Sequence, residues 1–313
     1  MKNYVCLFGA VFLWCVLMPA LVKPAIAGQA VENTNESEVV STGDSGVSVC
    51  YFDSFINQKI NMGLENYVAR ALSFLMPENI PYETLKAQAV AIRSVVCYRY
   101  ENNEHESFYL CSDPEHCFSL AAYPREDCVK AAEETAGVIL TWEGKAALAL
   151  SHLSSLIKTE NYETVYGKKI PYLVSLPVYD EKDMPGYKTT VKLTVEDFKG
   201  AFSDYSVVFN DDKEKWIGKT EFTQGGRVYI TEIGGLRFKG STVARLLGLK
   251  SLCFSIDINE DEVVIQTYGN GSGIGMSRNT AVLMAKEGED YKKILEYFYP
   301  GTSFSVIKAY KQN

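Results

Sequence analysis

YETLKAQAVAIRS, residues 82–94, is the stretch that determines most of what this sequence predicts about its fold. Its helix-forming pattern continues to Tyr100. Pro81 suits a first helical turn, because its fixed φ fits there and its missing N–H would have no partner. One apolar stripe recurs at helical spacing, formed by Leu85, Ala89, Ile92 and Val96. The pattern predicts a helix over 82–100 with this stripe on a core.

The opposite flank of this helix carries charge. Four residues fall within about a quarter-turn of one another, namely Glu83, Lys86, Val90 and Arg93. This spacing puts a carboxylate and two cations on one face. Such a face is either a binding surface or a solvated, ion-paired helix surface, and spacing alone leaves both interpretations open.

The rest of the chain alternates short strands and short helices. Strands are expected over 48–55, 189–195 and 227–234, and hairpins over 138–150 and 251–268. Helices are expected over 128–135, within 236–249, and over 279–286 and 291–299. The pattern predicts an α+β fold with mostly antiparallel strands packed with the long helix and the C-terminal helices, in a single domain.

A glycine loop, GNGSGIGMS over 269–277, lies between an expected strand and an expected helix. This context invites a dinucleotide interpretation, but the glycines alternate and do not fit the Gly-x-Gly-x-x-Gly register, so nucleotide binding is rejected. Alternating glycines allow positive φ and a close approach of the backbone to a ligand. A plain turn is the alternative.

Four motifs in the chain resemble the stage II sporulation protein D / LytB family. The segment 82–94 is similar to its signature helix, GSGIGMSR at 271–278 to its glycine loop, and 288–302 to its closing helix. A central strip is also similar, comprising Ser154-Ser155, Thr159-Glu160 and Pro171-Tyr172-Leu173. The motifs occur in the family's order and extend over residues about 50 to 308.

The resemblance implies a lytic transglycosylase of the sporulating cell, acting on peptidoglycan strands stripped of their stem peptides during engulfment. A single Glu protonates the glycosidic oxygen, and the sugar's own 6-hydroxyl closes on the anomeric carbon, so one acid suffices. It also implies a substrate-binding groove, formed by Lys86, Gln88, Arg93, Ser154, Ser155, Thr159, Ser272, Met276, Ser277 and Arg278, with Glu83 as a candidate catalytic residue beside it. The hydroxyl groups in this set can donate to sugar hydroxyls.

Three departures from the family pattern argue against intact chemistry. The family places its catalytic Glu directly before Met-Pro, and this chain has Leu75 there. Ser272 stands where the family carries His, and Arg278 where it carries Gln. Leu156-Ile157 replace paired glycines. Since leucine has no proton to donate, we expect a chain that binds glycan strands with lost or impaired cleavage.

Two acids close in sequence to Leu75 could substitute for the missing catalytic Glu. Glu78 and Glu83 both lie near the start of the long helix, and a helix N-terminus favours the ionised carboxylate, which is the wrong direction for a general acid. An active transglycosylase with a displaced acid therefore remains the alternative. A non-binding scaffold for engulfment membrane proteins is the second alternative.

A compact His/Cys cluster comprises His105, Cys111, His116 and Cys117. Two Cys and two His form a suitable closed tetrahedral set for structural zinc, and some clostridial-type members of the family hold zinc in a similar segment. A Cys111–Cys117 disulfide or free residues are the alternatives. His152 precedes Ser154-Ser155, but no acidic partner is identifiable in the sequence, so a serine hydrolase is not expected.

The N-terminus indicates export. Lys2 is followed by an uncharged, mostly apolar run over 3–22 and an Ala-Ile-Ala sequence before Gly28. Residues 1–27 are therefore expected to be a signal peptide or a membrane anchor, 28–47 a flexible linker, and 48–313 the domain. This places the domain outside the cytoplasm, and the formal charge of −8 gives no support for nucleic-acid binding.

Overall fold

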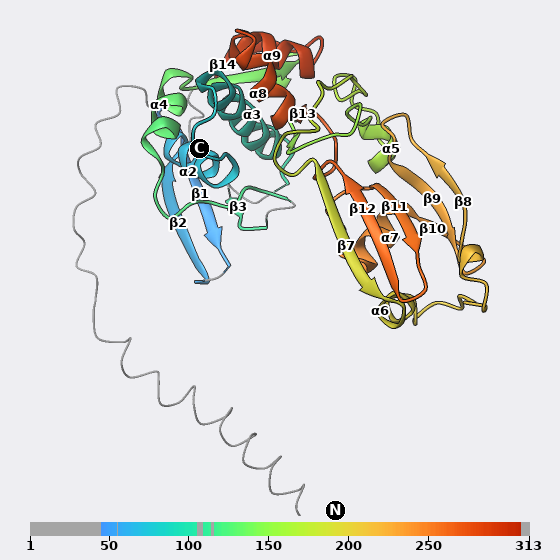
Figure 1. Ribbon diagram of the computed structural model, residues 1–313. Coiled ribbons are helices and arrows are strands. Elements are labelled where there is room, and N and C mark those ends of the chain that lie inside the picture. Colours follow the sequence, from blue (N-terminus) through green and yellow to red (C-terminus); the bar gives the residue numbers. More distant parts are fainter. Residues whose placement is uncertain (1–44, 55, 105–108, 114–115, 308–313) are drawn as a thin grey trace, which may run out of the picture. The chain divides into compact units, whose positions relative to one another are not determined.

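Helix α3 (Tyr82–Glu101) lies among several other helices in the computed structural model, which describes residues 45–54, 56–104, 109–113 and 116–307 (Figure 1). The helix predicted over 82–100 is confirmed, and its apolar stripe is buried in one core cluster. The opposite flank is not solvated, because a second cluster encloses it through Ala87, Val90, Ala91 and Val95. The helix is thus surrounded by protein rather than half-exposed.

Two helices and a small sheet form the first cluster. Helices α2 (Leu64–Leu75) and α4 (Glu126–Glu134) pack against α3. Helix α2 is absent from the sequence-based prediction, although its apolar residues repeat at helical spacing. The sheet has the order β2-β1-β3, with β3 parallel to β1, and its strands are β1 (Ser48–Asp53), β2 (Gln58–Gly63) and β3 (Tyr109–Cys111).

The second cluster contains the C-terminal helices, whose bounds lie within one residue of those predicted: α8 (Arg278–Lys286) and α9 (Tyr291–Phe298). Its sheet has the order β14-β4-β5, formed by Ser303–Val306, Val138–Trp142 and Lys145–Ala146. The hairpin predicted over 138–150 is shorter than expected. After Ala146 the chain leaves the sheet, and β6 (Ser151–His152) pairs in parallel with β13 (Met276–Ser277).

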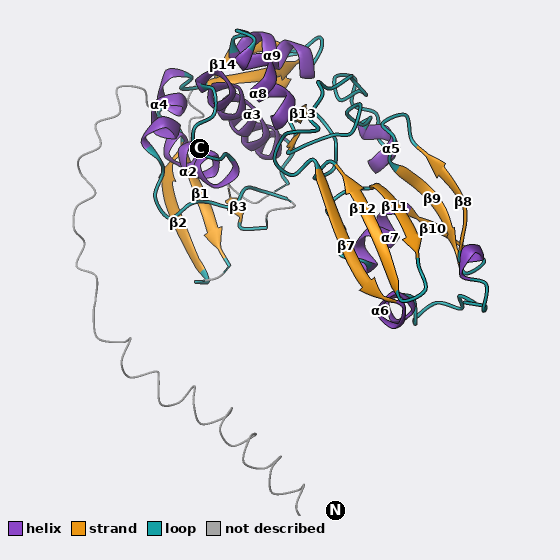
Figure 2. Ribbon diagram, viewed as in Figure 1, coloured by secondary structure: helices purple, strands orange, loops and turns teal. Residues whose placement is uncertain are grey.

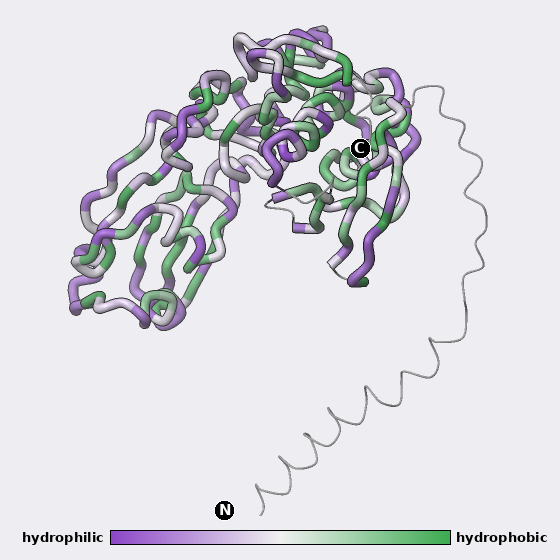
Figure 3. The backbone as a smooth tube through the Cα atoms, turned by 180° about the vertical axis from the view of Figure 1, so that it is seen from behind, coloured by the Kyte–Doolittle hydropathy of each residue, from purple (hydrophilic) through white to green (hydrophobic). Residues whose placement is uncertain are grey.

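The remaining strands form two antiparallel sheets around a third apolar cluster (Figure 2). One has the order β11-β12-β7, formed by Cys253–Ile258, Glu262–Tyr268 and Lys188–Thr194, and confirms the predicted 251–268 hairpin. The other has the order β10-β9-β8, formed by Leu236–Lys239, Val228–Ile233 and Ile217–Phe222. Apolar and polar stretches are interleaved along these strands, as expected of strands with one face on a core (Figure 3).

Short helices complete this part of the chain: α5 (Tyr162–Tyr166), α6 (Val195–Ala201), the 3₁₀ turn η2 (Lys213–Lys215) and α7 (Gly240–Leu246). The predicted α+β class with mostly antiparallel pairing is confirmed. None of the helices in the described ranges has both the length and the apolar character needed to span a bilayer. The leader predicted over 1–27 and most of the linker predicted over 28–47 lie outside the described residues.

Candidate functional site

The C-terminal end of α2 opens onto a cavity of about 370 Å³. Helix α2 ends at Leu75, because Pro77 disfavours a helical conformation at Met76. Leu75 is half-buried and forms part of the cavity wall. The opposite wall is the start of α8 and the loop 183–185. The position where the resemblance implies a catalytic glutamate therefore lies in a cavity and carries a hydrocarbon.

Arg278 connects two walls of this cavity. As the first residue of α8, it donates from Nη1 to the Leu75 carbonyl oxygen over 3.0 Å. Such a bond satisfies a free carbonyl group at the end of α2. Burial lowers the pKa of Arg278 to about 10, so the guanidinium keeps its charge at neutral pH. Two of the predicted departures, at 75 and 278, are thus in direct contact.

Among the described residues that line the cavity, no acid is sheltered from solvent. Its lining residues include two carboxylates, Glu78 and Asp183, and a second cation, Lys286. All three side chains are exposed. A general acid keeps its proton near neutral pH when burial or a nearby like charge raises its pKa. Glu78 and Asp183 are both exposed, so burial does not provide this effect for either of them.

The other departures lie elsewhere. Ser272 is exposed, and its hydroxyl accepts from the Ile274 amide over 3.3 Å. Leu156 and Ile157 lie near Gly226. None of these three residues is among those lining the cavity at the end of α2. Of the positions that depart from the family pattern, Leu75 and Arg278 therefore line this cavity, whereas Leu156, Ile157 and Ser272 do not.

Glu83 and Lys86 connect the start of α3 to α9. Their side chains form an ion pair of 2.5 Å, and Glu83 also accepts from the Tyr291 amide over 2.9 Å. The Lys86 ammonium lies 5.3 Å from the Tyr82 ring centroid and 5.4 Å from that of Tyr291. Neither side chain lines the cavity, so both have a role in packing here.

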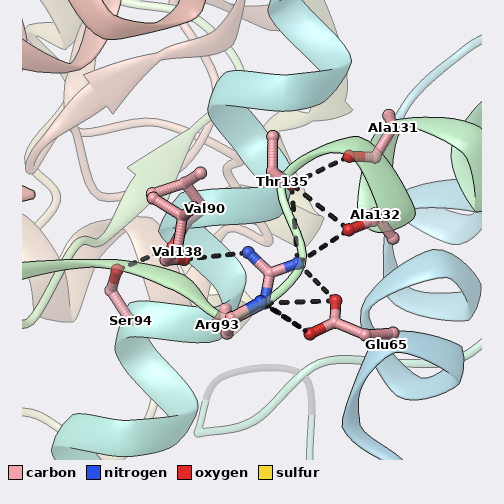
Figure 4. Close-up of polar contacts among 9 residues, drawn as sticks. Glu65, Val90, Arg93, Ser94, Ala131, Ala132, Thr135 and Val138 are labelled. Carbon is pink, nitrogen blue, oxygen red and sulfur yellow. Dashed lines mark hydrogen bonds and ion pairs between the residues drawn. The ribbon is translucent and has the colours of Figure 1, made fainter. Parts of the chain in front are cut away.

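Arg93 is fully buried and joins three segments (Figure 4). Its Nε donates to both carboxylate oxygens of Glu65 on α2, over 3.1 and 3.2 Å. The remaining N–H groups reach the carbonyl oxygens of Val138 and Ala132, over 2.9 and 3.2 Å. Gln88 is also buried, and its amide has no hydrogen-bond partner among the described residues. Sequence spacing gave no indication of Glu65, which belongs to the unpredicted helix.

Ser154, Ser155 and Ser277 are fully buried around one acid that sequence reasoning missed, Glu181. The carboxylate accepts from the hydroxyls of Ser154 and Ser277 over 2.6 and 2.5 Å, and from the Ser155 amide over 3.0 Å. The Thr280 hydroxyl adds a fourth bond of 2.6 Å. These bonds hold the start of α8, which carries Arg278, against the segment 154–155. The three serines thus bind Glu181 rather than a ligand, and through it they help to fix Arg278 at the cavity.

The glycine loop packs tightly onto its neighbours. A Cβ on Gly273 would lie 1.8 Å from Nη2 of Arg227, and one on Gly275 would lie 1.9 Å from the Leu150 carbonyl oxygen. Both residues also have positive φ, of 78° and 72°. The glycines thus allow two segments of the same chain to approach each other closely.

Two other residues of the predicted groove are also buried. Met276 lies in β13, and the Thr159 hydroxyl donates to the Val174 carbonyl oxygen over 3.0 Å.

His152 lies beside Ser155 in a buried setting. Its Nε2 is 2.7 Å from the Ser155 hydroxyl, to which Arg227 donates from Nη2 over 3.2 Å. Burial, and next the Arg227 charge, lower the pKa of His152 to about 3. The imidazole is therefore neutral and enclosed, and the pair has no access to a substrate.

Three residues of the predicted metal set come together. The Cys111 and Cys117 sulfurs lie 3.5 and 3.6 Å from Nδ1 of His116, and all three ligand atoms lie within 4.8 Å of one another. Zn–S bonds of about 2.3 Å and Zn–N bonds of about 2.0 Å at a tetrahedral angle put ligand atoms roughly 3.5 Å apart. Neither cysteine is in a disulfide. The trio could hold a metal ion, and His105 lies outside the described residues.

The surroundings of the trio suit a metal. Burial, and next the Arg99 charge, lower the pKa of His116, which favours the neutral form that binds metals. The second ring nitrogen, Nε2, lies 3.5 Å from a Glu104 carboxylate oxygen and 2.7 Å from Nη1 of Arg99. A carboxylate beside the ring nitrogen that does not bind the metal is a common support for a metal-bound histidine. Burial raises the pKa of Cys117 to about 12, so a cation must displace its proton.

A buried central helix, a tight glycine loop and a cavity between the end of one helix and the start of another define an α+β protein of the class that the resemblance implied. A sequence model described as "Stage II sporulation protein" matches residues 54–142. The stage II sporulation protein D of Bacillus subtilis (strain 168) is 30% identical over 272 residues, 81% of this chain and 78% of the relative. That of Bacillus amyloliquefaciens is 29% identical, over 85% and 81%. The chain therefore belongs to the stage II sporulation protein D family.

A more distant similarity supports this assignment. The amidase enhancer of Bacillus subtilis (strain 168) is 24% identical over 283 residues, which is 74% of this chain but 39% of that relative. The shared part is therefore one region of a longer protein.

Proposed function

We propose that this member of the family is an exported sporulation protein that binds peptidoglycan glycan strands without cleaving them. The observation that carries the proposal is the placement of Leu75 in the cavity wall at the end of α2. Protonation of a glycosidic oxygen needs a carboxylic acid at the leaving oxygen, and leucine has no proton to donate. Export is supported by the apolar N-terminal run.

The neighbour of Leu75 strengthens the argument. A buried guanidinium stabilises nearby carboxylates in their ionised form, so Arg278 opposes the function of any acid that reaches this end of the cavity. An active enzyme would have to use Glu78 or Asp183, which also line the cavity. Cleavage of glycan strands with Glu78 or Asp183 as the acid is the second candidate function. A scaffold protein whose cavity binds no glycan is the third.

We expect the purified chain to co-sediment with peptide-free glycan strands and to release no anhydro-ended products. Sedimentation and mass spectrometry of the supernatant measure both. Asp183→Trp should abolish co-sedimentation, because the ring would fill the cavity mouth. Asp180→Trp is the matched control, since Asp180 lies three residues away and does not line the cavity. Anhydro-sugar products would support the active enzyme, and a chain that never sediments would support the scaffold.

We further propose that the trio of Cys111, His116 and Cys117 binds structural zinc, with His105 as the fourth ligand. The donor set, two thiolates and two imidazoles, is the one that zinc prefers in closed sites. The described ligand atoms have the spacing of a tetrahedral site. Such an ion would fix the segment that follows α3.

Cys117→Ser is expected to reduce bound zinc from about one ion per chain to nearly none, and to lower Tm, because the folded apo site loses the energy of metal binding. Metal analysis and thermal unfolding with and without a chelator give the two readouts. Cys50→Ser is the matched control, because Cys50 lies in β1 outside the trio. A wild-type chain that contains no zinc, or a Tm that a chelator leaves unchanged, would contradict the proposal.

A further inference from the structure

Arg278 has hydrogen-bonding capacity that the fold does not use. Nη1 donates to the Leu75 carbonyl oxygen, but Nη2 makes no hydrogen bond to any described residue, and Nε is buried without a hydrogen-bond partner among them. No carboxylate among the described residues lies within 4.0 Å of the guanidinium. Burial is the sole cause of its lowered pKa, which reflects the same lack of a nearby acid. Buried charges are normally paired, so this cation lacks a counter-ion.

The position of this cation is also unusual for a protein helix. Arg278 is the first residue of α8, and a helix N-terminus carries partial positive charge that disfavours a cation and favours an anion. The Arg278 guanidinium and the dipole of α8 therefore attract the same kind of group, an anion. Arg278 lines the cavity at the end of α2 together with Asn279 and Val282, whereas the amides of Asn279 and Thr280 already donate to the Leu153 carbonyl oxygen and the Ser277 hydroxyl.

The walls of the cavity strengthen such an attraction. Leu75, Met76, Pro77 and Val282 provide apolar surface around the guanidinium, and a less polar surrounding makes an ion pair stronger. The acids of the lining, Glu78 and Asp183, are exposed and form no ion pair with Arg278, and the lining also contains the exposed cation Lys286. The site is therefore suited to one anionic group on an otherwise neutral ligand.

We propose that Arg278 binds the lactyl carboxylate of muramic acid in peptide-free strands and so selects for them. This inference rests on the proposed glycan-binding function. The stem peptide is attached to the lactyl group of muramic acid by an amide bond. Hydrolysis of this bond leaves a free lactyl carboxylate, so every second sugar of the strand gains one negative charge. A guanidinium pairs strongly with a carboxylate. An intact strand presents a neutral amide and a bulky peptide at the same position.

The test compares three ligands by fluorescence anisotropy with end-labelled strands: peptide-free strands, the same strands coupled to methylamine at the lactyl carboxylates, and strands with intact stem peptides. Wild-type chain should bind the first about tenfold or more tightly than the second, the expected size of a lost charge-assisted contact. Intact strands should bind weakly, although their peptides carry carboxylates of their own.

Arg278→Gln should bind the first two ligands with equal affinity, and Arg278→Lys should retain part of the preference. Arg237→Gln is the matched control, because Arg237 is an exposed arginine that pairs with Glu221 outside the cavity. A preference that survives in folded Arg278→Gln would overturn the inference and leave glycan binding standing. Tightest binding to intact strands would assign the carboxylate to the peptide and overturn it too. Wild-type chain that binds no strand would overturn the proposed function itself.

Discussion

Restoring a carboxyl group at position 75 alone is expected to leave the chain inactive on glycan strands, whereas Leu75→Glu combined with Arg278→Gln is expected to gain cleavage. Arg278 donates to the backbone oxygen of residue 75, so a new carboxyl group on that residue would lie near a buried cation. A cation within about 4–6 Å lowers a carboxyl pKa by roughly 1–3 units. The acid would then be ionised at neutral pH, and removal of the guanidinium should release it.

Time courses of anhydro-ended products, followed by mass spectrometry, measure the gain. The double variant should exceed the single one by about 10²-fold or more, the usual contribution of a placed general acid. Leu75→Gln/Arg278→Gln is the matched control, since it has nearly the same shape and no acid. Equal cleavage by Leu75→Glu and the double variant would show that Arg278 does not suppress an acid. No cleavage by the double variant would show that the cavity lacks other parts of the chemistry.

Glu65→Ala is expected to destabilise the folded chain by about 3–5 kcal/mol, because it leaves the fully buried Arg93 charge without its partner. The Gly137 amide, which donates to Glu65 over 3.1 Å, would lose its acceptor as well. Denaturant unfolding monitored by circular dichroism gives the change in the free energy of unfolding.

Two further variants test whether the loss of stability comes from the unpaired Arg93 charge or from the removal of any ion pair. Glu262→Ala removes the exposed partner of Lys192 and should cost less than about 1 kcal/mol. Glu65→Leu/Arg93→Met replaces both buried charges by apolar groups and should recover most of the loss. A loss for Glu65→Ala no larger than that for Glu262→Ala would show that the buried pair is not essential to the fold.

Local sequence patterns predicted those elements whose partners lie close along the chain. The central helix, both C-terminal helices and the 251–268 hairpin follow from periodicity and turn residues. Helix α2 was missed, although Leu64, Val68 and Leu72 recur at helical spacing. The short pair of β6 and β13 could not be predicted, because its strands lie more than a hundred residues apart and have two residues each.

The candidate site was predicted unevenly for a related reason. Leu75 and Arg278 were singled out by resemblance, but nothing in the sequence indicated that they touch across 203 positions. Helical angles placed Arg93 on a face without revealing that Glu65 covers it. Glu181 was missed entirely, because a lone acid in a loop has no local signature and its partners come from two distant segments.

The tight packing of the glycine loop has a consequence for how this family can diverge. Gly273 and Gly275 are held against Arg227 and Leu150, so any larger residue there would displace the surrounding chain. Ser272, which directly precedes Gly273 in the chain, has an exposed side chain. A substitution at position 272 is therefore expected to have little effect on folding stability. Positions 75 and 278, by contrast, are joined by a hydrogen bond, so an exchange at position 278 changes the surroundings of residue 75.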